Sequence, residues 1–219
     1  MYKFFIKRLL DVFLSTLAIL ILSPLLLPIV LGLLLTGEHY IFYFQERIGY
    51  KNKRFNIYKF ATMLKDSPNI GTGLHTTSKD PRILPMGGFL RKTKINELPQ
   101  LFNIFLGTMS IVGPRPLVDK TFEPYSEMVK KNIYNVKPGL SGIGSIVFRD
   151  EELLLSKSKI PIDEFYKTHI SPYKGDLELW YQKNLSLVDD SVKSIIKDVI
   201  LRGDKALFDY AKKFDHSDI

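Results

Sequence analysis

Several cations along the chain have the chemistry needed to bind phosphate. Arg115 lies between two prolines and is therefore held stiffly. A planar guanidinium of this kind makes bidentate contacts with phosphate oxygens, although a lone Pro-Arg-Pro is also common in exposed turns. Arg91 precedes a predicted helix whose N-terminus attracts anions. Lys59 and Arg47 are weaker candidates for the same pocket, because either one can be a solvated surface charge.

A small domain of mixed structure must position these residues. The alternation from Phe55 to Phe60 predicts a short strand, and the pattern from Asn96 to Phe105 predicts a helix that ends at Gly107. Residues 67–79 are rich in Gly, Ser, Thr and Asn and are predicted to form a loop. A further helix is predicted over residues 122–134. The expected fold class is therefore α/β, mostly α with a few short strands.

A long apolar run precedes this domain. It extends from Leu9 to Leu35, which exceeds the ~20 residues that a straight helix needs to cross a bilayer. Pro24 removes a backbone donor and is expected to kink this helix. Ser23 can donate a hydrogen bond to a carbonyl that the kink leaves free. A helix broken at Ser23 and Pro24 can enter one leaflet and return to the side from which it came.

The charges on either side of the run favour this re-entrant interpretation over a single span with a proline kink. Basic residues occur on both sides of it: Lys3, Lys7 and Arg8 before, and Arg47, Lys51, Lys53 and Arg54 after. Cytoplasmic flanks are enriched in Lys and Arg, so two basic flanks place both ends on the cytoplasmic face. The aromatic residues of segment 40–44 suit the bilayer interface. The single span is kept as the alternative.

Composition narrows the functional classes further. The 219 residues include 31 Lys or Arg and 23 Asp or Glu, a net charge of +8 that suits an anionic membrane face or phosphorylated substrates. The sequence has no helix-turn-helix, zinc-finger or aromatic RNA-binding signature, so no nucleic-acid partner is expected. The absence of cysteine excludes disulfides, thiolate catalysis and Cys-based metal sites. The four histidines are scattered without ligand spacing.

Two segments of the chain carry a family resemblance. Residues 91–103, RKTKINELPQLFN, and residues 107–116, GTMSIVGPRP, resemble the bacterial sugar transferases. These are the monotopic phosphoglycosyl transferases that begin glycoconjugate assembly. Further pieces of the same pattern follow in order: Lys7-Arg8, Asp11, Ser23-Pro24, Gln45, Arg47, Tyr58-Lys59-Phe60, Asp80-Pro81-Arg82 and Pro138-Gly139. The resemblance covers roughly residues 1–187.

The resemblance implies a re-entrant membrane helix and a catalytic domain with interfacial amphipathic helices on the cytoplasmic face of the bacterial inner membrane. It implies transfer of a phosphosugar from a UDP-sugar to undecaprenyl phosphate, which initiates O-antigen, capsule, exopolysaccharide or glycoprotein glycan synthesis. In the family, an Asp beside a Glu attacks the β-phosphate with the help of Mg²⁺, and UMP leaves. By this resemblance Glu97 is the central acid and the Mg²⁺ ligand, and Arg115 and Arg91 hold phosphate.

The chain departs from that pattern at the paired carboxylates, which here read Asn96-Glu97. A carboxamide has no anionic oxygen with which to attack phosphorus, so three hypotheses compete. In the first, Asn96 caps a helix and the nucleophile is Glu97 or another carboxylate such as Asp80, although Asp80 could also pair with Arg82. In the second, the phosphosugar passes directly from donor to acceptor, with Glu97 holding Mg²⁺ and Asn96 positioning phosphate. In the third, the protein is a catalytically silent relative that binds nucleotide-sugar or a partner enzyme.

The expected organisation has three parts: a membrane helix at 1–36, a catalytic domain at 37–187 and an atypical helical tail at 188–219. Residues 192–215 of the tail are similar to the N-terminal helices of histidinol dehydrogenase but include none of that enzyme's metal or cofactor residues. We therefore assign no activity to the tail. The expected partners are UDP-sugar, undecaprenyl phosphate and membrane lipids, while homo-oligomerisation and the identity of the sugar stay open.

Overall fold

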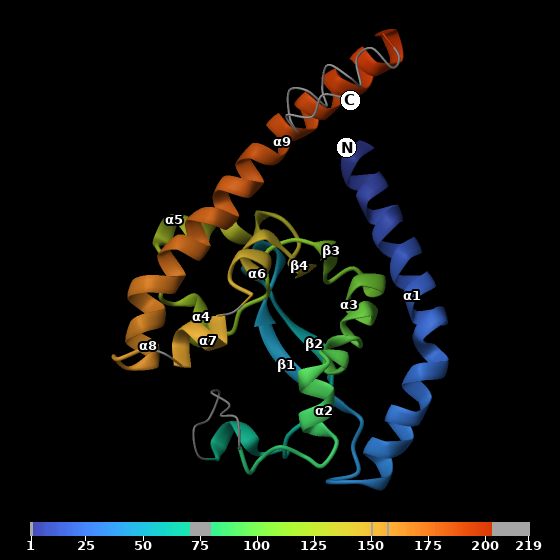
Figure 1. Cartoon of the computed structure of the whole chain (residues 1–219), viewed down its shortest axis with the longest axis vertical. Coiled ribbons are helices and arrows are strands. Elements are labelled where there is room, and N and C mark those ends of the chain that lie inside the picture. The colour runs from blue at the N-terminus through green and yellow to red at the C-terminus, as the bar shows by residue number, and fades with distance from the viewer. Residues whose placement is uncertain (1, 71–79, 150, 157, 203–219) are drawn as a thin grey trace, which may run out of the picture.

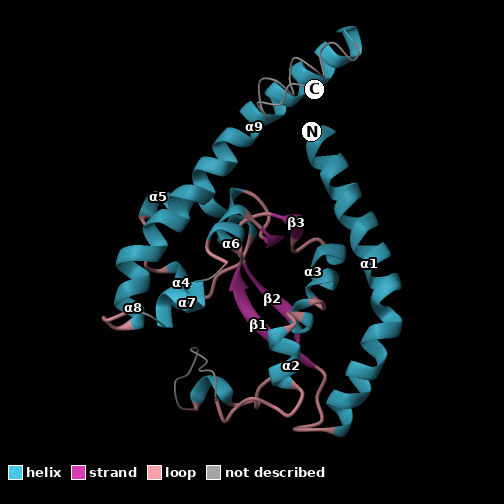
Figure 2. Ribbon diagram, viewed as in Figure 1, coloured by secondary structure: helices cyan, strands magenta, loops and turns pink. Residues whose placement is uncertain are grey.

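The structure, a computed structural model, describes residues 2–70, 80–149, 151–156 and 158–202. Helices dominate these residues, and the strands are short, as predicted (Figure 2). The α-helices are α1 (Tyr2–Leu35), α2 (Gly87–Lys92), α3 (Gln100–Leu106), α4 (Asp119–Phe122), α5 (Glu127–Asn132), α6 (Ile143–Val147), α7 (Glu151–Ser156), α8 (Ile162–Phe165) and α9 (Ser171–Arg202). Short 3-10 turns occupy Tyr50–Asn52, Ser67–Asn69, Ile95–Glu97 and Ile133–Asn135, and a π-helical turn occupies Tyr166–Ile170.

Two pairs of strands form the centre of the domain. Strands β1 (Phe42–Ile48) and β2 (Arg54–Phe60) make an antiparallel hairpin in which Tyr43 lies opposite Lys59 and Arg47 lies opposite Phe55. Because side chains alternate along a strand, this register places Arg47 and Lys59 on the same face of the hairpin. Strands β3 (Ser110–Val112) and β4 (Gly139–Ser141) pair in parallel. The strand predicted over residues 55–60 is confirmed.

One face of α1 packs against the domain along most of the helix. Near its C-terminal end, Ile29 and Leu33 are buried with Phe60 and Leu90. In its middle, Ala18, Ile19 and Leu22 pack against a second cluster around the buried Ile104. The opposite face exposes a row of large apolar side chains: Leu9, Leu10, Phe13, Leu14, Leu17, Leu20, Ile21, Leu25, Leu27, Leu31, Leu34 and Leu35. This segment is long and apolar enough to enter a membrane.

Polar side chains attach the N-terminal part of α1 to α3 and β3. The Arg8 guanidinium donates to the carbonyls of Ile104 and Phe105 in the last turn of α3, each at 2.6 Å. Lys7 Nζ donates to the carbonyl of Val112 at 3.0 Å. Asp11 is buried and accepts from the backbone N–H of Ile111 at 3.0 Å. These contacts fix the start of α1 to the same domain that buries its end.

The helix is not interrupted at Ser23 and Pro24, because α1 continues through both residues. Pro24 has no N–H to donate to the carbonyl of Leu20, and Ser23 Oγ donates to that carbonyl instead, at 2.9 Å. The expectation that Ser23 satisfies a freed carbonyl is therefore confirmed. The predicted break takes the form of curvature within one helix, and α1 curves around the domain (Figure 1).

Two of the predicted helices are divided in the structure. The helix expected over residues 96–105 is a 3-10 turn, Ile95–Glu97, followed by α3, which does end at Gly107. Gly107 has a left-handed φ of 89°, a conformation that favours glycine. The helix expected over residues 122–134 is replaced by α4, α5 and a 3-10 turn. Short turns between these segments redirect the chain, and hydrophobic periodicity alone does not reveal them.

Helix α9 lies on the opposite side of the hairpin from α1, and its C-terminal part extends away from the domain (Figure 1). It runs through the expected boundary at residue 187 as far as Arg202. Residues 203–219 of the predicted helical tail lie outside the described residues, and so do residues 71–79 of the predicted loop.

Candidate active site

The candidate site is a cluster of charges around Glu97, which ends the 3-10 turn between α2 and α3. Arg115 Nη2 lies 3.1 Å from Glu97 Oε1, and Lys59 Nζ lies 3.5 Å from the same oxygen. Arg115 and Glu97 are also close enough to Arg47 to affect its pKa. The structure thus brings together four residues that come from segments far apart in the sequence.

The cations are held by contacts outside the cluster. The Arg115 carbonyl accepts from the buried Tyr134 hydroxyl at 2.8 Å, and the same hydroxyl accepts from the N–H of Leu117. Arg47 donates to the carbonyl of Pro116 at 3.2 Å and to Gln45 Oε1 at 2.6 Å. These hydrogen bonds, together with the flanking prolines, restrain the segment around Arg115. Sequence reasoning assigned no role to Tyr134, because a buried tyrosine carries no signal that distinguishes it from ordinary core.

A buried amide holds α3 against the hairpin. Asn103 accepts from the N–H of Tyr58 at 2.9 Å and donates to the carbonyl of Asn56 at 2.8 Å. It is almost fully buried. These bonds fix the distance between β2, which carries Lys59, and α3, which follows Glu97. An asparagine in the middle of an apolar helix is the sequence signal that could have predicted these hydrogen bonds.

The ionisation of the cluster follows from burial and mutual charge. Burial alone would raise the pKa of Glu97, but Arg115 and Lys59 outweigh it and hold the pKa at about 2. Burial lowers the pKa of Lys59 to about 8, and Glu97 partly opposes that shift. Burial, with repulsion from Arg115, lowers the pKa of Arg47 to about 10. Near neutral pH the cluster therefore holds three cations and a single carboxylate.

This excess of positive charge defines the chemistry of the site. Three partly or largely buried cations with one carboxylate leave two positive charges uncompensated within the cluster. Burying unpaired charge is costly, so a doubly negative ligand complements the site better than a neutral one. A diphosphate diester has that charge, and guanidinium and ammonium groups are its usual partners. The geometry suits binding and polarisation of a phosphoryl group.

Asn96 is buried next to the cluster, and its Oδ1 has no hydrogen-bond partner among the described residues. The side chain does not cap α3, which begins at Gln100 after Pro99 and has no side-chain cap. The capping role considered for Asn96 is therefore wrong, because the expected helix start lies four residues too early. A buried amide oxygen without a partner is uncommon in folded proteins, so Asn96 stands out among the residues beside the charged cluster.

Asp80, which the sequence offered as an alternative nucleophile, forms an ion pair with Arg82. Arg82 donates to both carboxylate oxygens of Asp80, from Nε at 2.8 Å and from Nη2 at 2.5 Å. Both side chains are buried, and Arg82 also donates to the carbonyls of Ser67 and Ile70. The alternative in which Asp80 and Arg82 form a structural pair is confirmed.

Arg91, expected to hold phosphate, lies in the last turn of α2. Its guanidinium contacts Met63 Sδ at 3.7 Å. The described contacts of Glu97 are with Lys59 and Arg115 and do not include Arg91. Arg91 therefore belongs to α2, a separate short helix that ends at Lys92, and does not lie at the start of the 3-10 turn that carries Glu97.

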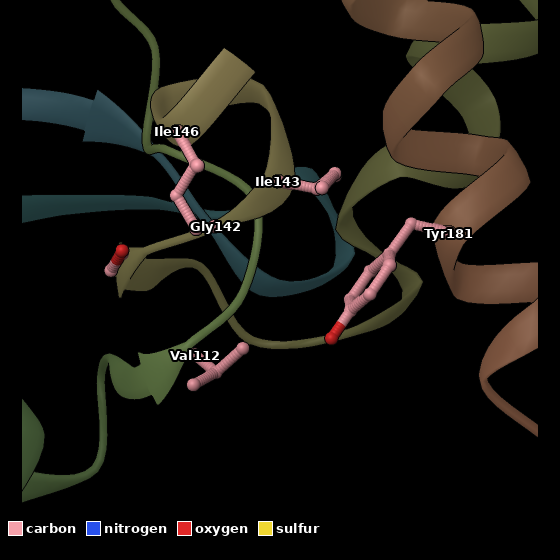
Figure 3. A pocket seen from close by; sticks show the side chains of 6 residues that line it. Val112, Gly142, Ile143, Ile146 and Tyr181 are labelled. Atoms are coloured by element: carbon pink, nitrogen blue, oxygen red, sulfur yellow. The ribbon is translucent and has the colours of Figure 1, made fainter. Parts of the chain in front are cut away.

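A small cavity of about 100 Å³ lies at the end of the β3–β4 pair (Figure 3). Tyr181 of α9 and Val112 of β3 line it, together with residues of the β4–α6 segment: Ser141, Gly142, Ile143 and Ile146. Its walls are almost entirely apolar, and none of its lining residues carries a charge. Among the described residues, the cationic cluster therefore fits a diphosphate better than this cavity does.

Comparison with known proteins shows the family of the chain. A family model described as "Bacterial sugar transferase" matches residues 2–200, so the chain belongs to the bacterial sugar transferase family. An uncharacterized sugar transferase of Haemophilus influenzae is 36% identical over 199 residues, covering 84% of this chain and 38% of that protein. The undecaprenyl-phosphate galactose phosphotransferase of Salmonella typhimurium is 32% identical over 217 residues, covering 92% of this chain and 42% of that protein.

For one shorter relative, the match covers a larger share of the relative's length. The exopolysaccharide production protein ExoY of Sinorhizobium fredii is 39% identical over 160 residues, covering 66% of this chain and 70% of that protein. By contrast, the chain spans only 30–38% of the length of three other curated relatives that it matches. The activities named for these relatives therefore support a proposal for this chain.

The charge coupling in the cluster can be tested without substrate. Replacing Glu97 with Gln removes the anion that favours protonated Lys59, so the pKa of Lys59 should fall below its value of about 8. Reductive ¹³C-methylation of lysines, followed by NMR titration in detergent, reports that pKa. The matched control is Glu46→Gln, because Glu46 pairs instead with the exposed Arg54. An unchanged Lys59 titration in Glu97→Gln would contradict the coupling.

Proposed function

We propose that the protein transfers a phosphosugar from a UDP-sugar to undecaprenyl phosphate and so initiates the synthesis of a bacterial glycoconjugate. The observation that carries the proposal is the cluster of Arg47, Lys59 and Arg115 around Glu97, which matches the charge of a nucleotide diphosphate. The named activity of the Salmonella typhimurium relative, undecaprenyl-phosphate galactose phosphotransferase, supports the substrate classes. The rigid segment around Arg115 supports a preorganised phosphate site, since fixed donors stabilise developing charge.

We propose further that the phosphosugar passes directly from donor to acceptor. An oxygen of the acceptor phosphate attacks the phosphorus that carries the sugar, the bond from phosphorus to UMP breaks, and UMP leaves with the bonding electrons. Three observations support this route. Asn96 is neutral, Asp80 is bound by Arg82, and the contacting oxygen of Glu97 is shared between two cations, which weakens its nucleophilicity.

We propose that Mg²⁺ binds this site together with the diphosphate of the substrate. The two consecutive residues Asn96 and Glu97 supply the oxygen donors, namely the unpaired amide oxygen of Asn96 and the Glu97 carboxylate. Mg²⁺ commonly takes one or two protein carboxylates and completes its shell with water and substrate phosphates. The neighbouring cations would repel the ion in the absence of substrate. When bound, Mg²⁺ would supply charge neutralisation at the transferring phosphoryl group, with Glu97 and Asn96 as its protein ligands.

We propose that α1 is re-entrant and that the catalytic domain lies on the cytoplasmic face of the bacterial inner membrane. A helix of 34 residues is about 50 Å long, which exceeds the ~30 Å hydrocarbon core. Both ends of α1 contact the same domain, through Arg8 and Asp11 at one end and Leu33 at the other. A straight crossing would separate one end of the helix from that domain.

Transfer can be measured with detergent-purified protein, Mg²⁺, undecaprenyl phosphate and a panel of UDP-sugars. We expect UMP release together with formation of a lipid-linked diphosphate sugar. Arg115→Ala should lower the rate by about 10²–10³, because a rigid phosphate donor is lost. Glu97→Gln should abolish most of the activity, and the exposed Lys131→Ala should leave it unchanged. Absence of transfer with every donor, restored by Asn96→Asp, would favour the silent binding protein instead.

The direct route predicts what happens when the protein receives the UDP-sugar without the acceptor. Without acceptor, we expect no UMP release and no phosphosugar adduct in the intact mass of the protein. Initial rates with both substrates varied should give intersecting double-reciprocal lines. Asn96→Asp restores a second carboxylate, so this variant should acquire an adduct. A phosphosugar adduct on the unaltered protein would contradict direct transfer while leaving the transferase activity intact.

The topology can be tested by labelling, because the chain contains no cysteine. Lys3→Cys and Lys53→Cys place single thiols on either side of the apolar run. In intact cells, a membrane-impermeant thiol reagent added from the periplasm should label neither thiol, and both should react after the membrane is permeabilised. Labelling of one thiol alone in intact cells would establish a single crossing.

A further inference from the structure

A second group of cations lies away from Glu97, at the C-terminal end of α3. Arg8 and Lys7 come from the first turns of α1, and Lys137 comes from the loop before β4. A Cβ added at Gly107 would lie 3.1 Å from Arg8 Cζ and 3.4 Å from Lys137 Nζ, so the two cations flank the same small space. Residues separated by about 130 positions in the sequence therefore meet at one point on the surface.

Among the described residues, the positive charge of this group is only partly balanced. The carboxylate whose charge acts on Lys137 is that of Asp11, which is buried and accepts from the N–H of Ile111. Lys7 and Arg8 donate to backbone carbonyls, whereas Lys137 has no hydrogen-bond partner among the described residues. Burial, followed by repulsion from Arg8 and Lys7, lowers the pKa of Lys137. An anion placed here would offset that repulsion.

The surroundings of the group are apolar and exposed. Leu10 and Leu14 project from the next turns of α1, and Phe105 and Leu106 project from α3. Val112, whose carbonyl accepts from Lys7, is also exposed. A soluble anion would gain nothing from these side chains. A lipid phosphate can meet the cations with its headgroup while its hydrocarbon chains cover the apolar side chains.

We propose that Lys7, Arg8 and Lys137 form a binding site for the phosphate headgroup of a lipid, separate from the Glu97 cluster. The two sites share no residue. Anionic phospholipid of the surrounding bilayer and a polyprenyl phosphate offer the same headgroup chemistry. A lipid held here would cover the junction of α1 and α3 and align both helices with the membrane surface.

Native mass spectrometry of the full chain in a neutral detergent tests the proposal independently of transferase activity. The probes are phosphatidylglycerol, phosphatidylcholine, a polyprenyl phosphate and inorganic phosphate. We expect one anionic lipid to bind more tightly than phosphatidylcholine and inorganic phosphate not to compete at equal concentration. Lys137→Gln should weaken the binding about fivefold, as expected for one basic residue near a lipid headgroup.

Two further variants make this result specific. Lys137→Arg retains the charge and should retain the binding, and Lys131→Gln removes an exposed lysine of α5 and should have no effect. If Lys137→Gln weakens phosphatidylglycerol binding, the ligand is bilayer phospholipid, and if it weakens only polyprenyl phosphate binding, the ligand is the acceptor class. Equal binding by Lys137→Gln and the unaltered chain, or equal affinity for phosphatidylcholine and both anionic lipids, would overturn the proposal.

Discussion

The Glu97 carboxylate, shared between Arg115 and Lys59, is the interaction on which the candidate site depends. It holds a guanidinium from the segment after β3 and an ammonium from β2 around one oxygen. Without that anion, three cations would repel one another in a partly buried space. The same arrangement leaves an excess of positive charge, which is a reason to bind a diphosphate. One carboxylate therefore holds the cations together and leaves the cluster with a net positive charge that a diphosphate can neutralise.

The long helix α1 connects this chemistry to the membrane. Its inner face supplies part of the domain core, through residues such as Leu33, while its outer face is a continuous row of exposed apolar side chains. Arg8 and Asp11 join its start to α3 and β3, the elements that precede Arg115. The position of the domain relative to the lipid is thus set by the helix that also stabilises it.

Much of this was accessible from the sequence, and the exceptions have physical reasons. The apolar run, the strand through Lys59 and the stiffness at Arg115 follow from periodicity and from proline geometry, which are local. The position of Arg91 and the failure of Asn96 to cap a helix were missed, because both depend on where a single turn ends. The charge coupling of Glu97 joins residues distant in the chain, so only the folded structure shows it.

The most direct measurement is a structure of the full chain with a non-hydrolysable UDP-sugar analogue. The account predicts that diphosphate oxygens lie within hydrogen-bond distance of Arg115 and Lys59, with Asn96 Oδ1 facing the ligand. A diphosphate found elsewhere, such as in the apolar cavity beside Tyr181, with the contacts of Glu97 unchanged, would contradict it.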